Sequence, residues 1–279
     1  MRMTPDSMYR TAFGMLAAVI ALAAAGCGGD GDETPAPSRA SERGGLPQGN
    51  EPVRLDPARF TTRIDNRWWP MRPGRRWRYR ETDQEGAKQD VVVTVTRRTK
   101  KIANGVTARV VRDTVTEDGQ IIEDTFDWYA QDKRGTIWYL GEDTAEFENG
   151  KLTTKEGSFE AGVDGAMPGV IMPAHPRDDQ AYREEYYKGH AEDRGEVLST
   201  REMAQTPYGF VKRALLIKDT TPLEPKVLEY KLYAPRIGPV LTVSVSGGPG
   251  SREELLRFDT APARWVKRAG TAPLGRGPT

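Results

Sequence analysis

Glycines recur through the middle of the chain at a spacing that strongly constrains its fold. Gaps of 19, 14, 16, 15 and 15 residues separate six of them, namely Gly86, Gly105, Gly119, Gly135, Gly150 and Gly165. Four of the six follow Asn or Asp, and such pairs favour tight hairpins because both residues tolerate positive φ. The runs between the turns are rich in β-branched and aromatic residues, as in VVVTVT (91–96) and TIWYL (136–140). This pattern predicts an antiparallel meander of about six strands over residues 75–160.

The second half of the chain continues the β pattern after a proline-rich connection. The segment MPGVIMPAHPRDDQ (167–180) contains three prolines, which predicts a crossing loop rather than a strand. Six strand-like runs follow: REEYY (183–187), RGEVLST (194–200), RALLIKD (213–219), VLEYKLY (227–233), PVLTVSVS (239–246) and REELLRF (252–258). Together the two halves predict an all-β protein, a large antiparallel meander of about twelve strands that forms a curved sheet, half-barrel or sandwich.

Composition sets the expected domain boundaries. Residues 53–262 contain no linker-like stretch, which favours a single antiparallel β domain over two smaller β units. The end of the chain, RAGTAPLGRGPT, is rich in Gly and Pro, so residues 263–279 are expected to form a disordered tail. Residues 27–52 are rich in Gly, Pro, Ser and charge with little to bury, and they are expected to form a disordered tether.

The first 27 residues have the features of an export signal. Arg2 and Arg10 precede sixteen uncharged residues, TAFGMLAAVIALAAAG, which is shorter than the ~20 that span a bilayer as a helix. The tetrapeptide Ala24-Ala25-Gly26-Cys27 resembles a bacterial lipobox, although the first position of that motif is more often Leu. The resemblance implies that residues 1–26 are a lipoprotein signal peptide and that Cys27 is acylated. We therefore expect an extracytoplasmic protein, anchored in the membrane of the cell envelope through lipidated Cys27.

The remaining composition excludes several kinds of chemistry. Cys27 is the single cysteine, so no thiol is left for a disulfide, a catalytic nucleophile or a thiolate metal site. Without residues 1–26 the chain has 39 basic and 39 acidic residues, a balance that gives no support for nucleic-acid binding. His175 and His190 are the two histidines, and they lack the spacing of a metal motif. We predict no metal, no other cofactor and no serine catalysis, since GxSxG and SxxK are absent.

The stretch EDTFDWYAQDKRGTIWYLGEDT (123–144) has two interpretations. Strand alternation places Phe126 and Trp128 on an apolar face and points Asp127 to water or to a neighbouring basic residue, which leaves Asp124 on the apolar face. Asp124 then needs an Arg partner or a bulge that turns it outward. In the alternative, the carboxylate candidates Asp124, Glu142 and Asp143 flank aromatic platforms, as in a sugar-binding protein or a glycoside hydrolase.

A second unusual stretch, WWPMRPGRRWRYR (68–80), alternates arginine with aromatic residues. Arg76, Arg78 and Arg80 share one strand face, and Trp77 and Tyr79 share the other. The arginines fit either contact with anionic headgroups or a solvated face that pairs with acidic strands, and pairing is favoured.

The same stretch carries a family resemblance. IDNRWWPMRPGRRWRYRETD (64–83) fits the pattern N-x-(Y/F/W)-(F/W)-P-(L/M)-x-P-G-x-x-W-x-Y, and YAPRIGPV (233–240) is similar to a Tyr-Ala-Pro-Gly-(V/I)-Gly-x-V turn with Arg236 in place of glycine. Both resemble an uncharacterised group of exported bacterial β proteins, and the resemblance covers about residues 60–260. A looser resemblance is to periplasmic lipoprotein carriers, whose half-closed sheet holds acyl chains on its concave face.

These observations favour a non-enzymatic, membrane-anchored protein that binds a lipid-like or other apolar ligand on a concave sheet face. The candidate ligand-binding residues are Trp69, Trp77, Trp128, Tyr129, Trp138 and Tyr139. The alternatives are a structural or interaction module of an envelope complex, and a protein that binds or hydrolyses sugars.

Overall fold

The computed structural model describes residues 45–83, 85–245 and 250–278. The predicted signal peptide, Cys27 and tether residues 27–44 lie outside the described residues. The strands are β1 (Phe60–Thr61), β2 (Arg75–Thr82), β3 (Lys88–Lys101), β4 (Thr107–Glu117), β5 (Gln120–Asp132), β6 (Ile137–Glu148), β7 (Lys151–Thr154), β8 (Phe159–Glu160), β9 (Gly169–Met172), β10 (Gln180–Arg183), β11 (Arg194–Thr206), β12 (Gly209–Thr220), β13 (Leu228–Ala234), β14 (Gly238–Ser244) and β15 (Arg252–Thr260). The helices are a 3-10 turn, Pro57–Arg59, and α1 (Ala263–Thr271).

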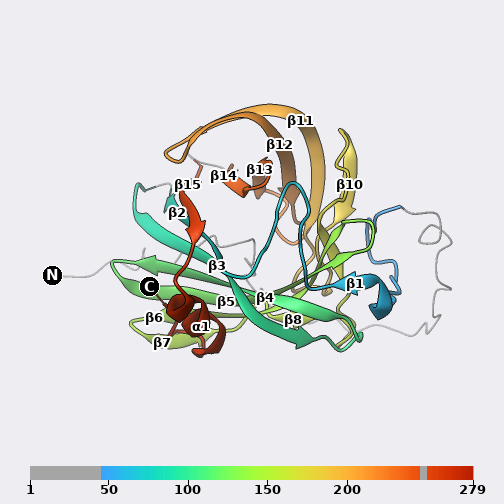
Figure 1. The fold of residues 1–279 in the computed structure, drawn as a ribbon, viewed down its shortest axis with the longest axis horizontal. Helices are drawn as coiled ribbons and strands as arrows, with labels where there is room; N and C mark the ends of the chain where they lie inside the picture. The colour runs from blue at the N-terminus through green and yellow to red at the C-terminus, as the bar shows by residue number, and fades with distance from the viewer. Residues whose placement is uncertain (1–44, 84, 246–249, 279) are drawn as a thin grey trace.

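All fifteen of these strands belong to one antiparallel sheet (Figure 1). Twelve form a continuous path in the order β10-β11-β12-β13-β14-β15-β2-β3-β4-β5-β6-β7, while β1 pairs with β5 and both β8 and β9 pair with β6. The sheet is open, with β10 and β7 as the end strands of that path. The predicted all-β class and curved antiparallel meander are confirmed. The proline-rich segment 167–180 is not wholly a loop, because it contains the short strand β9.

The first meander forms because its turn residues adopt the backbone that tight hairpins need. Asp118-Gly119 connects β4 to β5 and Asn149-Gly150 connects β6 to β7, and all four residues have positive φ between 49° and 77°. Two consecutive residues of this kind make the hairpin turn whose twist matches that of the flanking strands. The second meander runs from β10 to β15, and pairing of β15 with β2 joins it to the first.

The two stretches that carry the family resemblance contact each other on the inner face of the sheet. The indole N–H of Trp77 donates to the carbonyl of Ile237 at 2.9 Å, and the Tyr79 hydroxyl donates to the carbonyl of Pro239 at 3.1 Å. A Cβ at Gly238 would lie 2.6 Å from Trp69, so only glycine fits there. Arg236, which replaces the glycine of the pattern, has a φ of 68° and so keeps the left-handed backbone of that turn.

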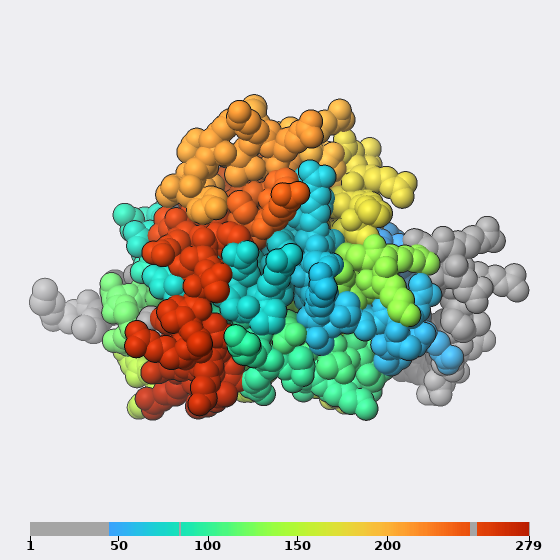
Figure 2. All heavy atoms as spheres, viewed as in Figure 1, coloured from blue at the N-terminus to red at the C-terminus, as the bar shows by residue number. Residues whose placement is uncertain are grey.

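Both faces of the first meander are covered. The second meander curves over the concave face, which carries Trp77, Tyr79 and Asp113 and which we call the inner face. Helix α1 and the chain after it lie on the opposite, outer face against β3 and β4 (Figure 2). The prediction of a disordered tail over 263–279 is therefore wrong for residues 263–278. Val266 and Ala269 are buried there, and the signal for so short a helix is weak in a segment rich in Gly and Pro.

The last part of the expected tether is also placed on the domain. The backbone N–H of Arg183 in β10 donates to the carbonyl of Pro47, and its guanidinium donates to the carbonyls of Gly49 and Glu51. These contacts fix residues 45–52, which the sequence analysis assigned to a disordered segment. Pro47 is also buried and Leu46 packs against the core, but two such residues in a segment rich in Gly, Pro and charge gave little sign of these contacts.

Candidate functional site

The inner face collects carboxyl groups from strands that are far apart in the sequence. Strand pairing places Glu81 directly opposite Glu253, Asp127 opposite Glu142 and Asp219 opposite Glu229. Like charges at directly paired positions are destabilising, so these pairs cannot all be ionised together at low energetic cost. The arrangement therefore favours protons or a cation on the inner face.

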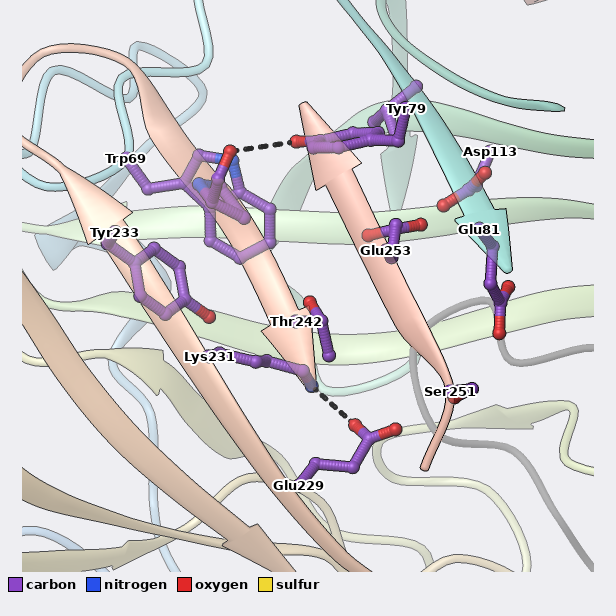
Figure 3. Close-up of a pocket in the computed structure, with 12 residues that line it drawn as sticks. Trp69, Tyr79, Glu81, Asp113, Glu229, Lys231, Tyr233, Thr242, Ser251 and Glu253 are labelled. Atoms are coloured by element: carbon purple, nitrogen blue, oxygen red, sulfur yellow. Dashed lines mark hydrogen bonds and ion pairs between the residues drawn. The ribbon is translucent and has the colours of Figure 1, made fainter. Parts of the chain in front are cut away.

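Some of these groups surround a cavity of about 40 Å³ between the two meanders (Figure 3). That volume holds a few water molecules or a group of similar size. Thr242 and Glu253 are only partly buried and form the more exposed side of the cavity. Its lining residues are Trp69, Tyr79, Glu81, Val93, Asp113, Glu229, Lys231, Tyr233, Pro239, Thr242, Ser251 and Glu253.

Two carboxyl groups of the cavity have an oxygen without a hydrogen-bond partner in the part of the chain that the structure describes. These atoms are Oε2 of Glu81 and Oδ1 of Asp113, in residues that are 3% and 7% exposed. Burial, followed by the charge of Glu229, raises the pKa of Glu81 to about 8. Burial, followed by the charge of Asp127, raises the pKa of Asp113 to about 8. Unpaired polar atoms are uncommon in protein interiors, and both of these belong to residues that line the cavity.

Lys231 is the one cation among the described residues that line the cavity. Its ammonium nitrogen lies 2.7 Å from Asp219 and 3.6 Å from Glu229 (Figure 3). Burial disfavours the charged ammonium, but the two carboxylates outweigh burial and raise the pKa of Lys231 well above its usual value. Lys231 therefore neutralises its own neighbours and leaves Glu81 and Asp113 without a cationic partner.

A second group of inner-face carboxyls surrounds Tyr139. The Tyr139 hydroxyl oxygen lies 2.9 Å from Asp127 Oδ1 and 2.8 Å from Glu142 Oε2. A phenol donates one hydrogen bond, so the second contact requires a proton on one of the two carboxyls. Burial, with the nearby charge of Asp127, raises the pKa of Glu142 well above its usual value. Burial also raises the pKa of Asp127, to about 7, so the two carboxyls share a proton beside the Tyr139 hydroxyl.

The aromatic candidates do not form one wall. Trp69, Tyr129 and Tyr139 pack together on the inner face, with ring centroids 5.7 Å apart for Trp69–Tyr129 and 5.0 Å apart for Tyr129–Tyr139. Trp69 is the only one of the six candidates that lines the cavity, while Trp77 shares the inner face and bonds to the late turn. Trp128 and Trp138 lie on the outer face.

Those two outer tryptophans make structural contacts. The ammonium of Lys100 lies 4.2 Å from the Trp128 ring centroid, and the Trp138 indole donates to Asp132 at 3.2 Å. Neither Trp128 nor Trp138 lines the inner cavity. The sequence pattern could not separate the two groups, because strand alternation shows which residues share a face but not which face is concave.

The carboxylate candidates are also divided. Glu142 lies on the inner face, whereas Asp124 and Asp143 lie on the outer face, so the three do not form a pair across one cleft. Asp143 pairs with Lys155 in a partly exposed ion pair. The expectation that Asp127 points to water or to a basic residue is wrong, because Asp127 is 2% exposed and hydrogen-bonded to Tyr139.

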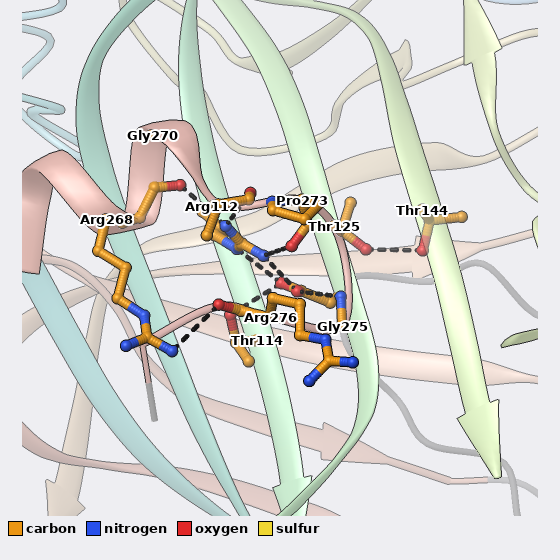
Figure 4. Close-up of polar contacts among 12 residues, drawn as sticks. Arg112, Thr114, Thr125, Thr144, Arg268, Gly270, Pro273, Gly275 and Arg276 are labelled. Atoms are coloured by element: carbon orange, nitrogen blue, oxygen red, sulfur yellow. Dashed lines mark hydrogen bonds and ion pairs between the residues drawn. The ribbon is translucent and has the colours of Figure 1, made fainter. Parts of the chain in front are cut away.

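Asp124 has an arginine partner, which was one of the two alternatives that the sequence left open. Arg112 donates to its Oδ1 at 2.8 Å and also to its Oδ2, and both side chains are at most 1% exposed (Figure 4). The rest of the guanidinium donates to the carbonyls of Ala272 and Pro273 at 2.8 and 2.9 Å. The N–H of Gly275 completes the group by donating to Asp124 Oδ2 at 2.8 Å. This ion pair fastens the C-terminal segment to β4 and β5.

Apart from Trp69, sequence reasoning missed the residues that line the cavity, although a signal for them exists. In LEYKLY (228–233), Glu229, Lys231 and Tyr233 share one strand face, and Asp113 shares a strand face with Val111 and Val115. Charged side chains at the apolar positions of a strand indicate a buried polar site or a second covered face. Only the pairing of distant strands shows that these positions meet.

Within residues 45–83, 85–245 and 250–278, no three His, Cys, Asp or Glu side chains are arranged to hold a metal ion. None of the helices described in the structure is long and apolar enough to cross a membrane.

The fold and the site together define an all-β protein in which one open, curved antiparallel sheet encloses a carboxyl-lined cavity. No protein-family model and no curated protein matches the chain. Two solved structures are similar. One is a Bacteroides fragilis protein described as exported and as having a YmcC-like fold, with 16% identity, a TM-score of 0.43, and coverage of 70% of this chain and 100% of that one. The other, from Parabacteroides distasonis and described as a lipoprotein, has 13% identity, a TM-score of 0.38, and coverage of 70% and 99%. At this level of similarity neither assigns a function.

We predict that Asp124→Asn lowers the free energy of unfolding by ~3–5 kcal/mol, because it leaves Arg112 buried without a counter-charge. The matched control Asp143→Asn breaks a partly exposed ion pair and should lower it by less than ~1 kcal/mol. Urea unfolding measures both values, and limited proteolysis after residue 262 reports release of the C-terminal segment. Equal, small losses in the two variants would contradict the structural role of the buried pair.

The raised pKa values predict that the domain becomes less stable as pH rises. Between pH ~4 and ~8 the folded chain keeps protons on Glu81 and Asp113 that the unfolded chain releases, so the free energy of unfolding falls across this window. Thermal unfolding should therefore give a higher Tm near pH 5 than near pH 8. Asp113→Asn, which is neutral at every pH, should raise Tm near pH 8 and flatten the dependence, while Asp143→Asn leaves the slope unchanged. A Tm that is constant or rises over this range contradicts burial of these carboxyls.

Proposed function

We propose that the chain is a membrane-anchored extracytoplasmic lipoprotein whose β domain binds a ligand without catalysing a reaction. The observation that carries the proposal is a pair of carboxyl oxygens without a partner among the described residues, on Glu81 and Asp113, which both line one cavity. Leaving a buried acceptor unpaired costs about 1–3 kcal/mol, so a ligand that donates to both oxygens recovers that free energy on binding.

The chemistry of the cavity favours the end of an organic amine as the ligand. An ammonium donates up to three hydrogen bonds, which suits the two free carboxyl oxygens, and the rings of Trp69, Tyr79 and Tyr233 provide faces that attract cations. A cavity of about 40 Å³ admits a methylammonium-sized group. Lack of a three-ligand cluster among the described residues favours an ammonium over a divalent metal ion.

The lipid-like ligand expected from the sequence has weaker support than an amine. Pockets for drug-sized ligands are roughly 300–1,000 Å³, far larger than this cavity of about 40 Å³. The walls also carry four carboxyl side chains, from Glu81, Asp113, Glu229 and Glu253, which an acyl chain would leave without partners.

A second candidate function is an interaction module, which one surface feature favours. Met203 and Phe210, on the paired strands β11 and β12, are 65% and 55% exposed. Large exposed apolar side chains near each other occur at protein contact sites. This candidate predicts a partner that is lost in Met203→Ser/Phe210→Ser and retained in variants of the cavity.

The ligand proposal predicts saturable binding of methylammonium to the Cys27→Ser chain, measured by titration calorimetry. Affinity should rise between pH ~6 and ~8, because the cation displaces protons from Glu81 and Asp113 while the probe stays protonated. Asp113→Asn should weaken binding about tenfold or more, as expected when a hydrogen bond to a charged group is lost.

The controls separate loss of the site from loss of the fold. Asp113→Asn is expected to be more stable than the parent near pH 8, so weaker binding by this variant cannot be attributed to unfolding. Asp143→Asn should bind like the parent. Absence of saturable binding near pH 8 overturns the amine proposal, and a lipid that stays with the Cys27→Ser chain in native mass spectrometry would favour the apolar ligand instead.

The anchor is tested by intact mass in a bacterial host that processes lipoproteins. We expect the mature chain to begin at Cys27 and to carry the mass of its acyl groups, and the Cys27→Ser chain to lack that mass. An unmodified secreted chain would contradict lipid anchoring.

A further inference from the structure

A second candidate binding site lies on the outer face, between β2 and the start of α1. It is a groove of about 510 Å³, lined by Arg76, Arg78, Pro262, Arg264, Trp265, Arg268 and Pro278. Four of these seven residues are arginines. The volume lies within the usual range for small-molecule pockets.

Trp265 organises the strand side of the groove. Its indole N–H donates to the Thr94 hydroxyl at 3.1 Å, which fixes the ring on the outer face of β3. The guanidinium carbons of Arg76 and Arg78 lie 4.8 and 5.7 Å from the indole ring centroid. Contacts of this kind hold the two arginines in place before any ligand arrives.

The acidic neighbours do not neutralise the groove. Arg76 makes two hydrogen bonds of 3.0 Å to Asp259, and Asp259 also pairs with Arg257 at 2.7 Å. Arg78 lies opposite Arg257 on one side and Val92 on the other, and its buried Nε has no hydrogen-bond partner within residues 45–83, 85–245 and 250–278. The expectation that the strand arginines pair with acidic residues is therefore correct for Arg76 and for Arg80, which pairs with Asp90. It is not correct for Arg78.

The helix adds positive charge to the opposite wall. Arg264 and Arg268 are one turn apart on α1, and both are exposed. Pro262 is the N-cap residue and makes no side-chain hydrogen bond, so the first N–H groups of the helix lack a side-chain cap. A helix N-terminus carries a partial positive charge that reinforces the arginines.

We propose that this groove binds a phosphate-bearing anion. Guanidinium groups match the oxygens of phosphate two at a time. Among the described residues, no side-chain carboxylate pairs with Arg78, Arg264 or Arg268 as Asp259 does with Arg76. The phosphate can belong to a phospholipid headgroup or to a free phosphate ester. This site shares no lining residue with the inner cavity, so the two proposals stand or fall separately.

The test uses the Cys27→Ser chain, whose own anchor cannot hold it on a membrane. Calorimetry with inorganic phosphate detects a free-anion site, and flotation with phosphatidylglycerol or phosphatidylcholine vesicles detects a headgroup site. Arg264→Gln/Arg268→Gln removes two exposed charges from the groove. Lys212→Gln/Arg213→Gln removes two exposed charges from β12 and is the matched control.

Binding to phosphatidylglycerol vesicles but not to phosphatidylcholine, with a roughly 30-fold loss in the groove variant and little change in the control, supports a headgroup site. Binding of inorganic phosphate that weakens about tenfold in Arg78→Gln supports a free-anion site. Binding of neither probe, or equal losses in the groove and control variants, overturns the proposal.

Discussion

The hydroxyl of Tyr139 lies between carboxyl oxygens of Asp127 and Glu142 and has a single proton to donate. One of those carboxyls must carry a proton, and the same reasoning extends along the inner face, where strand pairing sets Glu81 against Glu253. The second meander covers the inner face of the first and removes water from these positions. On an exposed strand, water would screen the repulsion between neighbouring carboxylates, whereas here protonation removes it. Folding, stability and ligand binding therefore all depend on which carboxyls carry protons.

Strand β5 buries one aspartate on each face, Asp124 and Asp127, and the structure stabilises the two in different ways. On its outer face Asp124 pairs with Arg112, and the C-terminal segment covers the ion pair with backbone carbonyls and one N–H. On its inner face Asp127 accepts from a tyrosine and has no arginine among its hydrogen-bond partners. The contacts of the Arg112–Asp124 pair with the C-terminal segment also position α1, and with it the arginine groove. Strand β2 contributes to both proposed sites, with Tyr79 and Glu81 on the inner cavity and Arg76 and Arg78 on the outer groove.

Much of the architecture could be predicted from the sequence, because hairpin turns are local. Residues such as Asn149-Gly150 determine a turn wherever the chain goes afterwards, and the meander follows from them. The candidate site depends on which distant strands become neighbours. Glu81 and Glu253 meet because β15 pairs with β2, and 171 intervening residues separate them in the chain. The alternation in β5 correctly grouped its residues by face, but the polar face was assigned to water or to a neighbouring basic residue, because nothing local shows that the second meander covers it.

Infrared spectroscopy of the Cys27→Ser chain tests the central claim most directly, because it separates the C=O stretch of a protonated carboxyl from the bands of carboxylate. Carboxyls in water titrate near pH 4, so a protonated band that persists near pH 7 reports buried groups. The structure predicts such a band near pH 7, a smaller band in Asp113→Asn, and a further decrease when methylammonium binds. Complete loss of the protonated band by about pH 6 would contradict the account, because the inner face would then hold ionised carboxylates.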